Sequence, residues 1–382
     1  MIINNTISYT MKTILRFVLK KVLDLFPLQK KVLFINFSGK GYGDNPKYIA
    51  NEILRQNLGY KLIWAISKGL NNHQVPKRIK VQEIGSLAFR FSLATSKVIV
   101  TNTKNDFTKK RKGQYLIQTW HAIYGTKCVE KDIIDCVPDS YIETSKKNSA
   151  ITDVFISGCN LQSDEYRRVF WCTSEVMESG LPRDDIFFDI NENRIAEIRR
   201  EIKVPEYARV CLFAPTFRKN NDMSWCTIDF QVVKNLLKKK FNCEWIVLTR
   251  LHPHLFDIEL ESLSGDGIIN VTKYPDMQEL LVISDLLITD YSSSVYDFSI
   301  LKRPAIIYAP DVHNQTKPLK EIFWELPFPI CLSDEDVYNA IDCFDEKQQK
   351  TRIDDFCKKF ISFDDGHASE RVVERIVEVI ES

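Results

Sequence analysis

Three segments in the second half of the chain each place polar side chains directly after a short apolar run. These side chains are Thr216 and Arg218, Arg250 and His252, and Asp290, Ser292 and Ser293. Short apolar runs of this kind are typical of strands buried in a parallel sheet, whose carboxyl ends meet at one edge. Arginine, histidine and hydroxyl groups that converge there can bind a diphosphate. We therefore predict a phosphate site at this edge.

The last of these segments, from Asp285 to Ile300, joins an apolar run, a polar turn and a helical pattern. This order presents backbone N–H groups and hydroxyls to an anion. On its own the segment is better explained by a serine N-cap on an ordinary crossover helix, and only the other two segments favour phosphate. Asp297, one turn into the helix, is predicted to accept hydrogen bonds from ribose hydroxyls, unless it is an acid on the helix surface.

In the first half, a histidine follows a predicted strand. Tyr115-Leu-Ile-Gln-Thr-Trp120 leads into His121-Ala-Ile-Tyr-Gly-Thr-Lys127. Open α/β sheets bind ligands at the carboxyl ends of their strands, and a neutral imidazole there can take a proton from an attacking hydroxyl near pH 7. A structural histidine bonded to a loop carbonyl is the alternative for His121. Lys127 is predicted to meet a charged acceptor or to cover a solvated helix face.

A glycine-rich loop, Ser38-Gly-Lys-Gly-Tyr-Gly-Asp-Asn-Pro46, follows the first predicted strand. Three glycines in five residues permit positive φ, but their spacing is not the G-x-G-x-x-G of dinucleotide sites. A tight turn would also explain them. Asp44, near the carboxyl end of this strand, is a candidate to face a ligand.

Apolar runs alternate with helical patterns along the chain, which indicates right-handed, doubly wound parallel sheets. The predicted strands are 32–37, 61–66, 98–101, 115–120, 209–214, 244–249, 268–272, 286–288 and 305–308. A charged helix over 191–203 and a linker at 204–205 are expected between the halves. The tail, 364–380, is predicted to be an amphipathic helix that packs across the domain junction.

The composition excludes several function classes. The 382 residues suffice for two domains, and the net charge of +1 provides no field that would attract nucleic acid. None of the ten cysteines lies in a Cys-x-x-Cys pair, which predicts reduced thiols in a cytosolic protein and no zinc site. We find no secretory signal, and no apolar run approaches the roughly 20 residues that span a bilayer.

Residues 11–26 have a clear helical period and are followed by Pro27. Four of the five charges in this segment are basic, which suits a helix lying in the interface of an anionic membrane. A helix packed on the first domain, or a dimer contact, is the alternative.

Seven motifs occur in one order along the chain. They are Gly39-Lys-Gly-Tyr-Gly-Asp-Asn-Pro46, Gln118-Thr-Trp-His-Ala-Ile-Tyr-Gly-Thr-Lys127, Gly180-Leu-Pro-Arg183, Ala214-Pro-Thr-Phe-Arg218, Arg250-Leu-His-Pro253, Thr289-Asp-Tyr-Ser-Ser293 and Asp364-Asp-Gly-His-Ala-Ser-Glu-Arg371. In this order they resemble the bacterial CDP-glycerol glycerophosphotransferase family of teichoic-acid and capsule synthesis. The resemblance implies an α/β GT-B fold of two doubly wound Rossmann-like domains, with a CDP-alditol donor held mainly by the second and an acceptor by the first.

The resemblance also implies roles for individual residues. His121 is expected to be the general base, and His252 to lie at the donor phosphates. The other donor-side residues implied are Thr216, Arg218, Arg250, Asp290, Ser292, Ser293 and Asp297, and the acceptor-side residues are Asp44, Lys127 and Arg183. No metal or other cofactor is expected. Family members commonly read Trp-His-Gly-Thr-Pro-Leu-Lys, whereas Ala-Ile-Tyr-Gly-Thr-Lys follows His121 here, so the loop that shapes the acceptor site differs.

The expected parts are a membrane-associating helix (1–28), an acceptor domain (29–204), a donor domain (205–362) and a crossover helix (363–382). The expected reaction transfers glycerol phosphate or ribitol phosphate from a CDP-alditol to a hydroxyl of a lipid-linked or capsular glycan and releases CMP. It would occur in the cytoplasm, on the anionic inner face of the plasma membrane. A glycosyltransferase that uses a nucleotide sugar and a non-catalytic nucleotide-sugar-binding protein are the alternatives.

Deleting residues 1–27 tests the membrane prediction. The shortened protein should no longer sediment with anionic liposomes, because the basic, amphipathic segment is removed, yet it should keep its turnover on a soluble acceptor. Neutral liposomes are the control for charge. Binding that survives the deletion would place the anchor elsewhere in the chain.

Overall fold

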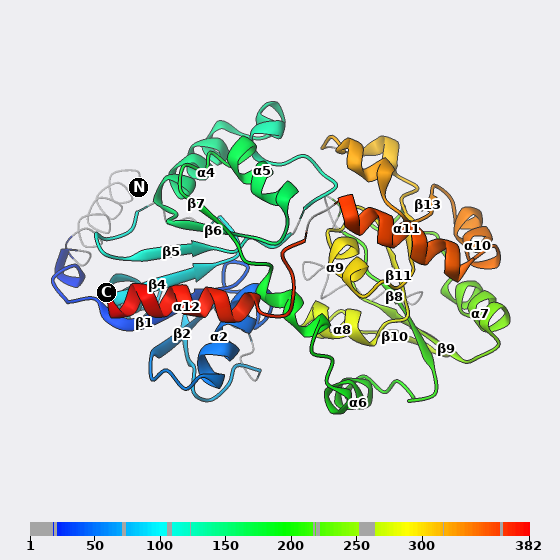
Figure 1. The fold of residues 1–382 in the computed structure, drawn as a ribbon, viewed down its shortest axis with the longest axis horizontal. Coiled ribbons are helices and arrows are strands. Elements are labelled where there is room, and N and C mark those ends of the chain that lie inside the picture. Colours follow the sequence, from blue (N-terminus) through cyan, green and yellow to red (C-terminus); the bar gives the residue numbers. More distant parts are fainter. Residues whose placement is uncertain are drawn as a thin grey trace, which may run out of the picture.

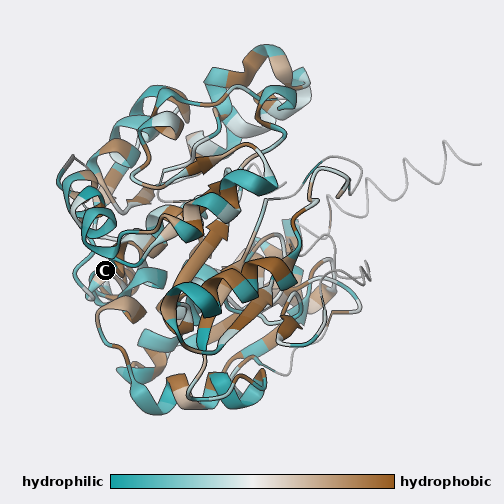
Figure 2. Ribbon diagram, turned by 90° about the vertical axis from the view of Figure 1, so that its right-hand side faces the viewer, coloured by the Kyte–Doolittle hydropathy of each residue, from teal (hydrophilic) through white to brown (hydrophobic). Residues whose placement is uncertain are grey.

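A computed structural model describes residues 18, 21–70, 74–104, 109–122, 124–216, 218, 222–251, 264–315, 317–359 and 362–382. The chain forms two parallel sheets with helices packed around them, and the two halves lie side by side (Figure 1). Hydrophobic residues are concentrated in the strands, and hydrophilic residues cover much of the outer helices (Figure 2). This is the arrangement of doubly wound parallel sheets that the alternating sequence pattern predicts.

The first sheet has the strand order β3-β2-β1-β4-β5-β6-β7. Its strands are β1 (Gln29–Ile35), β2 (Lys61–Ile66), β3 (Lys80–Glu83), β4 (Ser96–Thr101), β5 (Tyr115–Gln118), β6 (Val154–Ser157) and β7 (Glu175–Glu178). Its helices are α2 (Asp44–Arg55), α3 (Leu87–Thr95), α4 (Asp139–Ile151) and α5 (Asn160–Val169), with 3₁₀ helices η1 (Glu130–Cys136) and η2 (Pro182–Phe187). The central strand β1 is buried over its last five residues, as expected of a strand covered on both faces.

The second sheet has the order β10-β9-β8-β11-β12-β13. Its strands are β8 (Arg209–Phe213), β9 (Trp245–Thr249), β10 (Ile268–Asn270), β11 (Leu286–Thr289), β12 (Ala305–Tyr308) and β13 (Ile330–Cys331). The helices of this half are α6 (Glu192–Glu201), α7 (Phe230–Phe241), α8 (Met277–Ile283), α9 (Ser294–Ile300), α10 (Asp334–Asp342) and α11 (Glu346–Lys359), with η6 (Val312–Asn314) and η7 (Glu321–Glu325).

In each sheet the strand order reverses once, between β1 and β4 and between β8 and β11. Adjacent crossovers leave opposite faces of the sheet at such a point, so a crevice opens at the carboxyl ends of the two strands. The glycine-rich loop follows β1, and Thr216 follows β8. Both sets of candidate side chains therefore start at a switch point.

All nine predicted strands are present, with small differences at their ends. The predicted strands 32–37 and 115–120 end two residues early, because Phe37 and Trp120 have positive φ. Four strands were not predicted, namely β3, β6, β7 and β13, although the apolar run of β6 is as strong as that of β11. They are two to four residues long, and β3 and β7 are edge strands with polar residues.

The chain crosses back to the first half near its end (Figure 1). Helix α11 packs on α9 in the second half, whereas α12 (Ala368–Glu381) packs against α2, η2 and β4. Its buried side chains, including Val372, Val373 and Ile376, form the apolar stripe that the sequence predicts. Helix α6, expected to close the first domain, packs against α8 of the second half, and the boundary at residue 204 stays a prediction.

Truncating Ile376 should destabilise the protein by about 2–5 kcal/mol, because its fully buried side chain leaves a cavity between α12 and the first sheet. Chemical unfolding of Ile376→Ala measures the loss. The matched control is Glu374→Ala, an exposed position on the same helix, which should change stability by less than about 0.5 kcal/mol. Equal losses in the two variants would contradict the packing of α12.

Candidate active site

The two switch points have the same backbone arrangement. At the first, the Phe37 N–H donates to Asn102 Oδ1 at 2.8 Å; at the second, the Thr216 N–H donates to Asp290 Oδ1 at 2.8 Å. In both, the backbone N–H group lies just after the first strand of the switch point. A polar side chain just after the second strand accepts its hydrogen bond. The same kind of hydrogen bond therefore joins the two loops at each switch point.

His121 lies at the first switch point, half-buried between aromatic rings. Its ring centroid is 4.2 Å from that of Trp120 and 5.6 Å from that of Phe37. Its Nδ1 lies 3.0 Å from the carbonyl oxygen of Asn102. A carbonyl only accepts, so Nδ1 carries the proton and the lone pair of the neutral ring is on Nε2.

Burial lowers the pKa of His121, and the nearby Arg183 guanidinium lowers it further, against the Asn102 carbonyl and Asp44, which favour the charged ring. The imidazole is thus neutral near pH 7 and able to accept a proton at Nε2. The contact with a loop carbonyl is the one that the structural alternative describes, and it also leaves the lone pair of Nε2 as the acceptor, so the role of His121 as a base stays a prediction.

Asn102 and Asn36 were not among the site residues predicted from the sequence. The Asn102 Nδ2 donates to Asn36 Oδ1 at 2.8 Å and to Asp44 Oδ2 at 3.1 Å. Asn36 in turn donates to carbonyls of the glycine-rich loop. The only signal was position, since each asparagine directly follows a strand of the switch point.

The second switch point holds Arg218 among carboxylates and aromatic rings. Its Nη1 lies 2.7 Å from Asp290 Oδ2, and its Nε and Nη2 donate to the two oxygens of Asp311 at 2.7 and 3.1 Å. The guanidinium stacks 4.3 Å from the Trp225 ring and 5.0 Å from the Tyr291 ring. Thr216 Oγ1 donates to Asp290 and accepts from Arg218. Asp311, Trp225 and Tyr291 were not predicted.

Lys127 reaches this second cluster from the first half. Its ammonium lies 4.6 Å from the centroid of the Tyr291 ring, and among the described residues no carboxylate forms an ion pair with it. Burial lowers its pKa to about 8, with Asp290 and Asp311 opposing the shift and Arg218 and Lys317 adding to it. Lys127 was expected on the acceptor side, and the structure places it with the donor-side residues.

The structure shows fewer contacts for the remaining residues that were predicted on the donor side. Ser292 Oγ lies 2.9 Å from Ser294 Oγ, and Ser293 is the N-cap residue of α9, without a side-chain cap bond. The Arg250 guanidinium donates to the Tyr274 carbonyl at 3.3 Å, and burial lowers its pKa to about 10. His252 lies outside the described residues.

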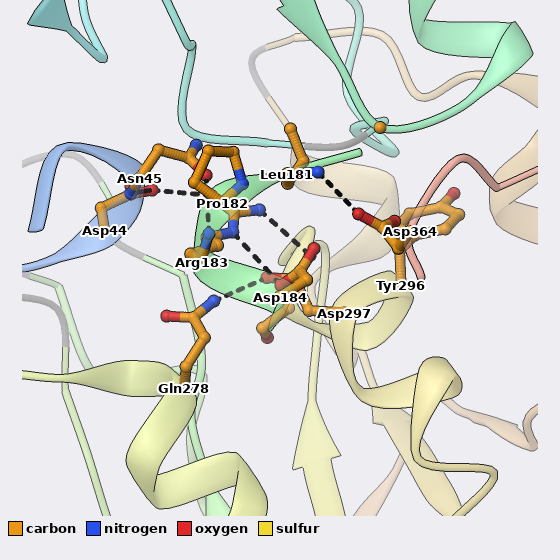
Figure 3. Close-up of polar contacts among 12 residues, drawn as sticks. Asp44, Asn45, Leu181, Pro182, Arg183, Asp184, Gln278, Tyr296, Asp297 and Asp364 are labelled. Carbon is orange, nitrogen blue, oxygen red and sulfur yellow. Dashed lines mark hydrogen bonds and ion pairs between the residues drawn. The ribbon is translucent and has the colours of Figure 1, made fainter. Parts of the chain in front are cut away.

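Asp44, Arg183 and Asp297 lie together in a buried cluster between the two halves (Figure 3). Arg183 donates to Asp44 at 3.1 Å and to Asp297 at 3.0 Å, and Gln278 donates to the second oxygen of Asp297 at 3.1 Å. Asp297 is 2% exposed, so the alternative of a helix-surface acid is wrong. Both of its oxygens are already hydrogen-bonded, and its role at the ribose stays a prediction.

In the part of the chain that the structure describes, no group of three or more histidine, cysteine or acidic side chains is arranged to hold a metal ion. Within the same residues, none of the helices combines the length and the apolar character of a membrane span.

The chain folds into two doubly wound halves, which is the GT-B class of fold that the resemblance implies. A candidate base lies at the switch point of one half, and cations lie at the switch point of the other. The chain belongs to the CDP-Glycerol:Poly(glycerophosphate) glycerophosphotransferase family, whose model matches residues 18–378. The resemblance inferred from the seven motifs is thereby confirmed.

The solved structure of the wall teichoic acid polymerase TagF, soaked with CDPG, is similar to this chain. Its TM-score is 0.84 at 25% identity, covering 99% of this chain and 97% of that one. A teichoic acid poly(glycerol phosphate) polymerase of Staphylococcus epidermidis is 29% identical over 361 residues, 90% of this chain but 50% of that protein. A teichoic acid glycerol-phosphate transferase of Staphylococcus aureus is 28% identical over 376 residues, 93% of this chain and 95% of that protein. The chain thus spans about half the length of the first relative and nearly all of the second.

Proposed function

We propose that this protein transfers an alditol phosphate, glycerol phosphate in the first instance, from a CDP-alditol to an acceptor hydroxyl and releases CMP. The single observation that carries the proposal is the position of His121 within a family of CDP-glycerol transferases. Its Nδ1 is fixed on a carbonyl, and burial keeps the ring neutral, so Nε2 is a base at the mouth of the first sheet.

In the proposed reaction, His121 Nε2 takes the proton of the acceptor hydroxyl as its oxygen bonds to the β-phosphorus. The bond between that phosphorus and the oxygen shared with the α-phosphate breaks, and CMP leaves with the bonding electron pair. Arg218 and Lys127 stabilise the charge that develops on the leaving phosphate. Phosphoryl transfer requires little beyond such positioning and charge stabilisation. The proton on His121 then passes to solvent.

One short loop carries both the base and a cation. Lys127 follows His121 by six residues, which can separate their Cα atoms by at most about 21 Å when fully extended. The loop is also bound to the second half, through the Cys128 N–H to the Pro318 carbonyl at 2.9 Å and the Lys320 N–H to the Thr126 carbonyl at 2.8 Å. Binding both substrates between the halves would therefore bring the reacting groups into register.

The finer parts of the proposal concern the acceptor and the location. We propose a lipid-linked or polysaccharide acceptor of teichoic-acid or capsule type, reached from the cytoplasmic face of the membrane. The basic pattern of residues 11–26 supports this location. CDP-ribitol is the second donor candidate.

Release of CMP tests the reaction. CDP-glycerol, CDP-ribitol and UDP-sugars are each supplied with a glycan acceptor, and the free nucleotide is identified by chromatography. The proposal requires CMP from a CDP-alditol. UDP release would favour a glycosyltransferase, and the absence of turnover with selective thermal stabilisation by one nucleotide would favour a non-catalytic binding protein.

Replacing His121 by alanine should lower kcat by about 10²–10⁴-fold, because general-base catalysis is lost, while CDP-glycerol still binds. In the wild type, the rate should fall as the pH drops through the lowered pKa of His121, since the protonated ring cannot accept a proton. The matched control is His367→Ala, an exposed histidine at the start of α12. Full activity in His121→Ala would remove the base from the mechanism.

Donor affinity should depend on the protonation of Lys127. The ammonium form attracts phosphate, so affinity should be constant below the pKa of about 8 and fall as the pH rises through it. Calorimetric titration of CDP-glycerol into His121→Ala measures this without turnover. Adding Lys127→Met should lower affinity by about 10–100-fold and flatten the profile, whereas Lys127→Arg should flatten it and retain affinity. An unchanged pH profile in Lys127→Met would contradict the assignment.

A further inference from the structure

Arg183 is the one cation in this cluster of the described chain, beside the carboxyl groups of the buried Asp184 and Asp297 and of the partly buried Asp44 and Asp364 (Figure 3). It lies in η2, between the two halves, and is 3% exposed. On one side it pairs with Asp44, where α2 begins; on the other it pairs with Asp297 in α9. Its ion pairs therefore link the base side of the site to the helix that follows Ser292 and Ser293.

The cluster contains more carboxyl groups than the single charge of Arg183 can neutralise. Burial raises the pKa of Asp184 and of Asp297, and raises that of Asp364 to about 7. Neither oxygen of Asp184 accepts a hydrogen bond from a described residue; its nearest cation is Arg183 Nε at 3.7 Å. Well-packed apolar side chains commonly give equal or greater stability than a buried ion cluster. Stability alone therefore does not account for Arg183.

Two short paths of hydrogen bonds join Arg183 to His121. In the first, Asp44 accepts from Asn102 Nδ2, and the carbonyl of the same asparagine accepts from His121 Nδ1. In the second, which starts from the backbone rather than the side chain, Asn45 Oδ1 accepts from the backbone N–H of Arg183 at 3.1 Å, and Asn45 Nδ2 donates to the Trp120 carbonyl at 3.2 Å. Each path ends at a backbone atom that sets the direction of the His121 ring.

The backbone is strained where these paths run. Asp44 and Trp120 both have a φ of 53°, a left-handed conformation that is uncommon for residues other than glycine. Such conformations cost on the order of 1 kcal/mol and persist where surrounding contacts hold them. The contacts here are those of Arg183, Asn45 and Asn102.

We propose that Arg183 is a positioning residue: its guanidinium orients His121 through Asp44 and Asn102, and its bond to Asp297 ties that orientation to the donor half. The role in turnover rests on the proposed function, whereas the effect on the His121 ring does not. Arg183 touches neither substrate in this role, which replaces the acceptor contact expected from the sequence.

The charged side chains that act on His121 are Asp44 from α2 and Arg183 from η2, and they act in opposite directions. Removing the guanidinium should raise the pKa of His121, and removing the Asp44 carboxylate should lower it. The acid limb of the kcat/KM profile should follow, moving to higher pH in Arg183→Met and to lower pH in Asp44→Asn. Arg183→Lys keeps the charge but loses the two-sided fork, so it should lower kcat without moving the limb.

The experiment combines an NMR titration of histidine-labelled protein, with the His121 signal assigned from His121→Ala, and steady-state kinetics with CDP-glycerol. The matched control is Lys47→Met, since Lys47 in α2 pairs across the junction with Asp276 of α8 and lies on neither path. We expect Arg183→Met and Arg183→Lys to lose at least tenfold in kcat with the donor KM within twofold, while Lys47→Met leaves the His121 titration unchanged.

Thermal melting identifies variants that fail to fold. If Arg183→Met does not fold, Asp44→Asn still predicts a lowered His121 pKa, and Arg183→Lys still predicts a loss of kcat with the His121 titration unmoved. An unshifted His121 titration in folded Arg183→Met or Asp44→Asn, or a change in KM with kcat retained, would overturn the positioning role. A wild type that binds CDP-alditols without releasing CMP would overturn the proposed function alone, because the NMR titration is independent of turnover.

Discussion

The segment from His121 to Cys128 is bound at both ends, and the rest of the site depends on this constraint. At one end, Nδ1 of His121 is held by the Asn102 carbonyl; at the other, Thr126 Oγ1 donates to the Tyr291 carbonyl at 2.7 Å. One end therefore belongs to the first switch point and the other to the second. A loop anchored in this way limits how far apart His121 and Lys127 can lie.

The junction between the halves is polar where a single-domain core would be apolar. Besides Arg183, the ion pair Lys47–Asp276 joins α2 to α8, and Lys320–Glu165 joins the second half to α5. These ion pairs are largely buried, and interfaces between domains are commonly more polar than permanent ones. Helix α12 packs on α2, η2 and β4, so its apolar stripe fixes the end of the chain on the first half after the chain has crossed from the second.

The fold was predictable because it depends on local pattern: consecutive buried apolar residues specify β1, β2 and β11 without knowledge of their partners. The site was predictable only in part. Asp297 was correctly placed on a helix, but which neighbour its face meets depends on how two halves pack, and the sequence does not encode that in any local spacing. Asn102 contacts His121 through its backbone carbonyl as well as contributing its side chain to the site. Every residue has such a carbonyl, so no residue type in the sequence could indicate this contact.

Tyr124 lies within the segment after His121 that departs from the usual family motif, and the expectation that this loop shapes the acceptor site stays a prediction. The Tyr124 ring lies 4.0 Å from the Lys320 ammonium and 6.3 Å from the Tyr296 ring of α9, and burial raises its pKa to about 12. Both contacts are with the second half. Tyr124 thus contributes to the attachment of the loop across the junction.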